Sequence, residues 1–344
     1  MLAAKTRVAI LLEDGIKGKH GKTGLAFLRY SNTNIVAVID RSCAGESLAE
    51  LTQISCDAPI VSDVNTALAY KVDVLLIGIA PSGGKLPDNL AQEIRIAVSA
   101  GVSIINGLHT QLQPQYPNLQ SGQWIWDIRQ EPPGLSIGTA KARSLAAQRI
   151  LTVGTDMAIG KMSTSLEIHR AALAAGIKAQ FVATGQAGIA IAGQGIALDA
   201  VRVDFAAGAV EKTVIDLAQD NELIIIEGQG SLLHPGSTAT LPLIRGSQPT
   251  ALILVHRAGA KHIRDLPEIT IPSLPDVIKL YETVASAGGT FGEVKVKAIA
   301  LNTFGMDIDT ANKTIQSTAE LTGLTCSDVV RFGGKTLLSA ITAN

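Results

Sequence analysis

The sequence predicts an α/β protein built from parallel sheets covered by helices, and three observations support this fold class. Short aliphatic runs alternate with helical stretches along almost the whole chain, which is the pattern of repeated β-α units. Hydrophobic residues make up 47% and aromatic residues only 3%, so the cores must consist of Ala, Val, Ile and Leu, as in buried parallel sheets. The length of 344 residues predicts about two domains.

The first β-α series predicts a Rossmann-like parallel-sheet domain over residues 1–140. The expected strands are Val8–Leu12, Ile35–Ile39, Val72–Ile77 and Val102–Asn106, and the expected helices are Thr23–Tyr30, Thr66–Ala69 and Asn89–Ala100. From Pro114 to Lys141 the alternation stops, and the segment is rich in Pro, Gln and Gly and contains Trp124 and Trp126. Such a composition is typical of a domain boundary whose aromatic residues pack at the junction.

A second β-α series predicts a P-loop NTPase-like α/β domain over residues 141–344. Its expected strands are Ile150–Val153, Gln180–Ala183, Leu223–Ile226, Ala251–His256 and Val296–Asn302. The first of these leads into the loop Gly154–Gly160, "GTDMAIG", and the helix Lys161–Ala175. Glycines let backbone N–H groups turn toward an anion, the helix N-terminus adds its positive dipole end, and Lys161 adds a point charge. Five residues separate the two glycines, where the usual signature has four.

Met162 stands where a magnesium-binding hydroxyl usually follows the lysine. A thioether cannot replace that ligand, because Mg²⁺ requires hard oxygen donors. Ser163 or Thr164 would present a hydroxyl if the helix began one residue later; alternatively, Met162 simply packs against the sheet. Asp156 either offers Mg²⁺ a carboxylate or braces backbone N–H groups of the loop. Because the loop offers few oxygen ligands for Mg²⁺, the sequence favours a protein that binds its phosphate-bearing ligand without hydrolysing it.

Three motifs resemble those of dethiobiotin synthetase and its relatives. "GTDMAIGK" is similar to their GTDxxxGKT loop, and "LIIIEGQGS" is similar to their strand that ends in Glu-Gly. The resemblance implies that Glu227 helps to hold Mg²⁺ and that Asn302 at the end of a later strand reads adenine. Ser163 and Asp156, considered above, are the other candidate Mg²⁺ ligands. The residues expected at the phosphate-bearing ligand are Gly154, Thr155, Asp156, Gly160, Lys161, Met162, Ser163, Thr164 and Asn302.

A closer resemblance extends over nearly the whole chain. The stretches "DIRQEPP", "GTDMAIGKMSTSLEI", "ATGQAGI", "IEGQGSLLHPG" and "LIRGSQPTALILVH" look like a bacterial family long known only as hypothetical proteins. Members of that family have been assigned as D-glutamate N-acetyltransferases that work beside an epimerase-type partner enzyme. The resemblance implies that acetyl-CoA is used and that the phosphate loop holds the phosphate-rich end of coenzyme A.

Acetyl transfer to an amine requires a base and a group that stabilises an oxyanion. The stretch "EGQGSLLHPG" follows a predicted strand and offers Glu227 and His234 as alternative bases, with Lys161 at the phosphates. Ligands of open α/β sheets bind at the carboxyl ends of strands, where this stretch should lie. Arginine can clamp a substrate carboxylate, and the loop Thr184–Ile189 can add donors. The expected substrate residues are Gln186, Gln229, Ser231, Arg245 and Arg257.

The stretch Gly15–Thr23, "GIKGKHGKT", is a second glycine- and lysine-rich segment, and it follows the first predicted strand. Asp40 ends the next strand, where a Rossmann fold places its ribose-binding acid. The spacing G-x-x-G-x-x-G nevertheless departs from the dinucleotide fingerprint. The segment is therefore interpreted either as an anion site or as a solvated turn.

The bulk properties limit the partners. A net charge of −1 gives no reason to expect nucleic acid, and no apolar run approaches the length of a membrane span. Three widely spaced cysteines fit a cytoplasmic protein, and the apolar content favours a homo-oligomer. Three functions remain open for a small-molecule substrate: N-acetylation of an acidic amino acid with acetyl-CoA, an ATP- and Mg²⁺-dependent ligase or kinase reaction, and nucleotide-dependent regulation without turnover.

Overall fold

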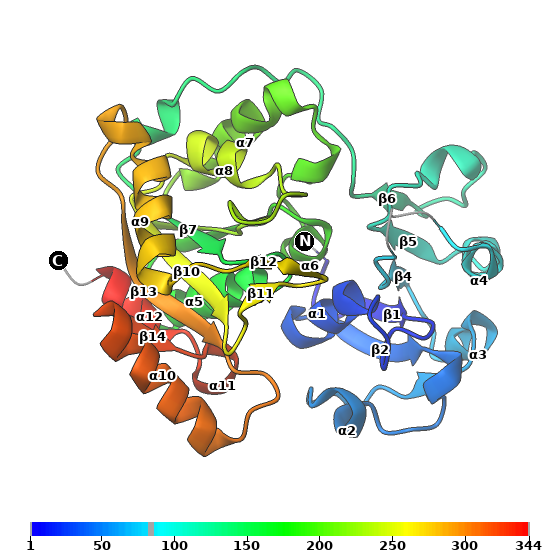
Figure 1. The fold of residues 1–344 in the computed structure, drawn as a ribbon. Helices are drawn as coiled ribbons and strands as arrows, with labels where there is room; N and C mark the ends of the chain where they lie inside the picture. The colour runs from blue at the N-terminus through cyan, green and yellow to red at the C-terminus, as the bar shows by residue number, and fades with distance from the viewer. Residues whose placement is uncertain (1, 82–85, 343–344) are drawn as a thin grey trace. The chain divides into compact units, whose positions relative to one another are not determined.

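The computed structural model describes residues 2–81 and 86–342, which form two compact α/β units (Figure 1). The first unit contains the chain up to Glu131 together with Gln186–Ala200. The second contains Pro132–Gly185 together with the chain from Val201 onward. Among the described residues, none of the helices is long and apolar enough to cross a bilayer.

The first unit is a six-stranded parallel sheet in the order β3-β2-β1-β4-β5-β6. Its strands are β1 (Arg7–Leu11), β2 (Asn34–Ile39), β3 (Ile60–Val61), β4 (Val74–Ile77), β5 (Ser103–Asn106) and β6 (Ile125–Asp127). Its helices are α1 (Lys22–Tyr30), α2 (Leu48–Thr52), α3 (Val64–Leu68), α4 (Asp88–Ser99) and α6 (Gln186–Ala192), with short 3₁₀ turns at η1 (Arg41–Cys43), η3 (Gln113–Gln115) and η5 (Leu198–Ala200). Helices α3 and α4 cover one face of the sheet. Helix α1 packs closely on β1 and β4, because Gly24 lies directly against Gly78.

The second unit is also a six-stranded parallel sheet, in the order β14-β13-β10-β7-β9-β8. Its strands are β7 (Gln148–Gly154), β8 (Ala179–Val182), β9 (Leu223–Ile226), β10 (Ala251–Arg257), β13 (Lys295–Asn302) and β14 (Thr325–Ser327), and β11 (His262–Ile263) pairs with β12 (Leu266–Thr270) in a hairpin. Its helices are α5 (Lys161–Ala174), α7 (Val203–Ala218), α8 (Thr240–Ser247), α9 (Leu274–Ala285), α10 (Ile308–Thr322), α11 (Val329–Phe332) and α12 (Lys335–Thr342), with 3₁₀ turns η4 (Lys141–Ser144) and η6 (Ala287–Gly289). One core layer joins α5, α11 and α12 to the strands. Helices α7, α8 and α9 pack against other parts of the sheet (Figure 1).

The predicted α/β fold with parallel sheets is confirmed, and every expected strand is present with small differences at its ends. Two expectations about local structure are wrong. The segment Pro114–Lys141 contains strand β6, which pairs with β5 because Ile125 and Trp126 add to the sheet edge. The expected loop Thr184–Ile189 becomes helical from Gln186, since "QAGIAIA" offers a helical run with buried Ile189 and Ala190.

Candidate functional site

The phosphate loop lies at the carboxyl end of the central strand β7. The loop connects Gly154, the last residue of β7, to Lys161, the first residue of α5. Gly160 adopts φ 118°, a left-handed conformation that suits glycine, and its position before α5 is not capped by a side chain. The first N–H groups of a helix have no acceptor within the helix, so this end is a favourable place for an anion.

Lys161 is buried, and its ammonium group folds back over the loop. Its Nζ donates to the backbone oxygen of Asp156 at 2.7 Å. A Cβ on Gly154 would lie 3.3 Å from this Nζ and 2.9 Å from the side chain of Ile159. Glycine at position 154 therefore leaves the room in which the lysine lies across the end of the strand.

The polar side chains of the loop brace its backbone. The carboxylate of Asp156 accepts from the N–H of Met157 at 2.6 Å and from the N–H of Arg264 in the β11–β12 hairpin at 2.7 Å. Asn302, at the end of β13, donates from Nδ2 to the oxygen of Ile159 at 2.9 Å. These contacts favour the interpretation of Asp156 as a brace, and they give Asn302 a contact with the loop itself.

Tyr281 and His256 hold the end of β7 in place, and the sequence analysis assigned this role to neither of them. Tyr281 on α9 is fully buried; its hydroxyl donates to Gly154 O at 2.7 Å and accepts from Leu232 N at 3.0 Å. Tyr281 thus connects the phosphate loop to the stretch that follows β9. Thr155 bonds to Nδ1 of His256 at 2.9 Å, and burial lowers the pKa of His256 to about 4, so the imidazole is neutral.

Met162 occupies the second position of α5, because the helix begins at Lys161 without a shift. Thr164 is buried and Ser163 is half-buried within the first turn. The helix therefore does not begin one residue later, and the expected contact of Ser163 or Thr164 with a ligand stays a prediction. The standard magnesium-ligating position carries a thioether.

Glu227 follows β9 and lies among donors at the carboxyl edge of the sheet. Its Oε2 accepts from Thr184 N at 2.9 Å and Gly185 N at 3.3 Å, and its Oε1 accepts from Gln229 Nε2 at 3.0 Å. The side chain is 3% exposed. Burial raises the pKa of Glu227 from 4.5 to about 7, although these hydrogen bonds and the charge of Lys161 act in the opposite direction.

The donor set at this edge does not fit a magnesium ion well. The carboxylates of Glu227 and Asp156 accept backbone and side-chain N–H groups, and the thioether of Met162 stands at the usual ligand position. Within the described ranges, there is no group of three or more His, Cys, Asp and Glu side chains that could hold a metal ion.

The stretch from Ser231 to His234 forms a compact turn after β9. The N–H of Ser231 donates to Oγ of Ser237 at 2.9 Å, and Nδ1 of His234 accepts from Gly236 N at 3.0 Å. Because Nδ1 is used as an acceptor, the neutral imidazole carries its proton on Nε2. This geometry favours Glu227 over His234 as a base.

The two arginines expected to clamp a substrate lie at opposite edges of the sheet. Arg257 ends β10, is exposed, and lies beside Asn302 at the carboxyl edge. Arg245 lies in the last turn of α8, three residues before Gln248, whose oxygen accepts from Arg149 near the start of β7 at 2.8 Å. The expected place of Arg245 after a strand is wrong, because the end of a crossover helix leads back to the amino edge of the sheet.

Gln186 belongs to the first unit. It begins α6 in the first unit, where its Nε2 donates to Oγ1 of Thr23 at 3.4 Å and its side chain packs against Gly107. Its expected contact with the substrate stays a prediction.

The stretch Gly15–Thr23 is a tightly folded turn at the carboxyl end of β1. A Cβ on Gly21 would lie 2.2 Å from the oxygen of Gly15, so the backbone segments are in direct contact. Asp40 is fully buried and accepts from Ile16 N at 3.0 Å, which shows that this acid braces the turn.

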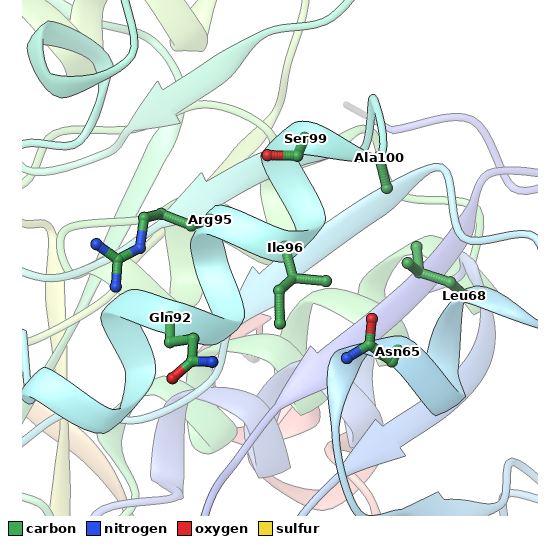
Figure 2. Close-up of a pocket in the computed structure, with 7 residues that line it drawn as sticks. All are labelled: Asn65, Leu68, Gln92, Arg95, Ile96, Ser99 and Ala100. Atoms are coloured by element: carbon green, nitrogen blue, oxygen red, sulfur yellow. The ribbon is translucent and has the colours of Figure 1, made fainter.

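A groove on the outside of the first unit is shown in Figure 2. Asn65 and Leu68 of α3 lie opposite Ile96 of α4, and Gln92 and Arg95 of α4 also line the groove (Figure 2). The groove lies on helices that cover the sheet and contains none of the residues discussed above.

The loop, its lysine and the buried glutamate define a P-loop α/β protein, whose other unit has the strand order of a Rossmann-like sheet. Comparison with family models agrees: residues 136–338 match "Domain of unknown function (DUF1611_C) P-loop domain", and residues 41–131 match "Domain of unknown function (DUF1611_N) Rossmann-like domain". The chain belongs to the DUF1611 family.

Similar proteins include one with a crystal structure and two that carry an enzyme name. The crystal structure of a DUF1611 family protein from Anabaena variabilis ATCC 29413 is 58% identical, covers 99% of this chain and 100% of that chain, and superimposes with a TM-score of 0.96. A protein of Pseudoalteromonas sp. named D-glutamate N-acetyltransferase is 37% identical over 75% of this chain and 78% of its own length. A protein of Tritonibacter scottomollicae with the same name is 35% identical over 80% of this chain and 83% of its own length.

Proposed function

We propose that this protein is an N-acetyltransferase that transfers the acetyl group of acetyl-CoA to the amino group of an acidic amino acid, with D-glutamate as the expected substrate. The observation that carries the proposal is the similarity to two proteins named D-glutamate N-acetyltransferase, each over three quarters or more of this chain. The phosphate loop with Lys161 supports it by offering a place for the phosphates of coenzyme A.

Acetyl transfer forms a C–N bond between the amine and the acetyl carbon and breaks the C–S bond of the thioester. A base takes one proton from the amine, and this proton is passed to the leaving thiolate, which departs as free coenzyme A. Glu227 suits this task, because a pKa of about 7 lets the carboxyl group exchange a proton near neutral pH. Arg257 at the same edge of the sheet is the candidate partner for a substrate carboxylate.

An ATP-dependent ligase or kinase is the second candidate, and the glycine–lysine loop beside a buried glutamate favours it. The thioether of Met162 at the usual ligand position argues against the metal that such a reaction needs. Acetyl transfer is therefore the function that we propose.

A thiol-release assay tests the proposal. The purified protein receives acetyl-CoA with D-glutamate, L-glutamate or other amino acids, beside a parallel assay of phosphate release from ATP and Mg²⁺. We expect free coenzyme A with D-glutamate, and a loss of about 10- to 100-fold in affinity for acetyl-CoA in Lys161→Ala, because charge-assisted hydrogen bonds to phosphate are lost. Lys212→Ala, on the exposed face of α7, is the matched control. Phosphate release without thiol release would reject the transferase and favour the ligase or kinase.

A further inference from the structure

The first unit contains a cluster of charged side chains to which the proposed function gives no role. The cluster consists of His109, Arg129 and Asp199. Nη1 of Arg129 lies 2.7 Å from Oδ2 of Asp199 and also contacts Nε2 of His109, and this Nε2 is 3.9 Å from the same Asp199 oxygen.

These residues gather at the carboxyl edge of the first sheet. His109 follows β5 and Arg129 follows β6, and these two strands are parallel neighbours that end with Asn106 beside Asp127. Asp199 reaches the same place from η5, in the Gln186–Ala200 segment that joins this unit. Ligands of open α/β sheets bind outside the carboxyl ends of strands, so the position is that of a binding site.

A buried carboxylate holds the surrounding backbone in place. Asp127 accepts from Nδ2 of Asn106 at 2.7 Å, from Leu112 N at 3.0 Å and from Gln113 N at 2.9 Å. Asn106 in turn accepts from Leu108 N at 3.0 Å. These hydrogen bonds hold both ends of the loop that carries His109 without the help of a ligand.

Arg129 is incompletely satisfied where it lies. Its side chain is only 11% exposed, and its Nε is buried without a hydrogen-bond partner. Burial lowers the pKa of Arg129, which Asp199 partly opposes. A guanidinium has five N–H donors, and leaving a buried one without a partner is costly. A further anionic oxygen that accepted from Arg129 would therefore stabilise this arrangement.

The two partners of Arg129 are much more open to solvent. The side chains of Asp199 and His109 are 45% and 46% exposed. Since Arg129 can only donate, Nε2 of His109 must accept, which leaves Nδ1–H of the neutral ring as a donor. A ligand that displaced the carboxylate of Asp199 would therefore meet the guanidinium of Arg129 and, beside it, the Nδ1–H donor of His109.

We propose that Arg129 and His109 form a binding site for a small molecule with a free carboxylate, and that Asp199 occupies this site as an internal substitute when no ligand is bound. A carboxylate is the expected ligand because a carboxylate is what the arginine holds now. The site lies within the first unit and does not depend on the phosphate loop.

Isothermal titration of the full-length protein tests this proposal, with glutarate and D-glutamate as probes and the neutral diamide glutaramide as the uncharged comparison. We expect the two carboxylates to bind and glutaramide not to bind. Arg129→Gln should weaken carboxylate binding at least about tenfold, while Arg95→Gln, an exposed arginine on α4, should leave it unchanged. Asp199→Asn should tighten binding by about tenfold, because it removes the competing internal carboxylate.

The Asp199 variant separates a binding site from a merely structural ion pair, since a variant that folds poorly does not gain affinity. Unchanged or weaker binding in Asp199→Asn would overturn the proposal, and so would equal affinities of the wild type and Arg129→Gln. Lys161→Ala distinguishes this proposal from the acetyltransferase proposal. If it abolishes thiol release but keeps glutarate binding, the two sites are separate as proposed. Thiol release by a wild type that binds neither carboxylate at Arg129 would reject this inference alone.

Discussion

Replacing Glu227 by Gln tests the electrostatics on which its role as a base depends. Burial raises the pKa of this carboxyl from 4.5 to about 7 in the folded protein. An acid with a higher pKa in the folded state holds its proton more tightly there than in the unfolded chain. Its contribution to stability is therefore fully present below pH 4.5 and is lost as the pH rises to about 7. The difference corresponds to about 3 kcal/mol in the free energy of unfolding.

Urea unfolding followed by circular dichroism measures this contribution in the wild type and in Glu227→Gln. Glutamine has nearly the same shape and stays neutral at every pH. The stability of the wild type relative to the variant should therefore fall by about 3 kcal/mol between pH 4.5 and about 7, and then stay constant. Glu222→Gln is the matched control, because it makes the same substitution at an exposed position just before β9.

A stability difference that stays constant over this range would refute the reasoning, because it would show that Glu227 ionises as easily in the folded protein as in the unfolded chain. If the predicted fall is found, the same carboxyl should control the reaction. The rate of thiol release should then rise as the pH passes through about 7, since a base must be ionised to accept a proton.

Three further predictions concern the supports of the site. Tyr281→Phe should lower the free energy of unfolding by about 2–4 kcal/mol in urea titrations, because it leaves one buried and one partly buried backbone group without a partner; an unchanged midpoint would contradict this. Gly228→Ala should cost about 3 kcal/mol or more and weaken acetyl-CoA binding, because the new Cβ would lie 1.7 Å from the oxygen of Thr152; Gly292→Ala, with open space around it, should be nearly neutral. Asp156→Asn should cost about 1–3 kcal/mol and speed amide exchange at Arg264, and equal exchange rates in both proteins would refute the bracing role.

Much of the fold and part of the site could be predicted from local patterns. Aliphatic runs between helical stretches predicted the β-α order, because buried parallel strands must be short and apolar. The stretch Gly154–Lys161 predicted its own loop, because glycine conformations and the helix start are local properties. Glu227 was singled out because "LIIIEGQGS" resembles the strand of dethiobiotin synthetase that ends in Glu-Gly, and because it follows a predicted buried strand.

Other members of the site were decided by contacts between distant parts of the chain. Tyr281 and Gly154 are 127 residues apart in sequence, and a tyrosine within an amphipathic helix gives no sign that its hydroxyl holds a strand end. The edge at which Arg245 lies depends on the direction in which α8 crosses the sheet.

The sequence by itself determined the β-α order, the phosphate loop and the residues that follow each strand. Only the tertiary structure decided that Gln186 joins the first unit and that Asp199 meets Arg129 there. The physical reason is that periodicity and loop conformation depend on neighbours in the chain. The partner of a buried charge depends instead on which strand ends and crossing segments the folded sheet brings together.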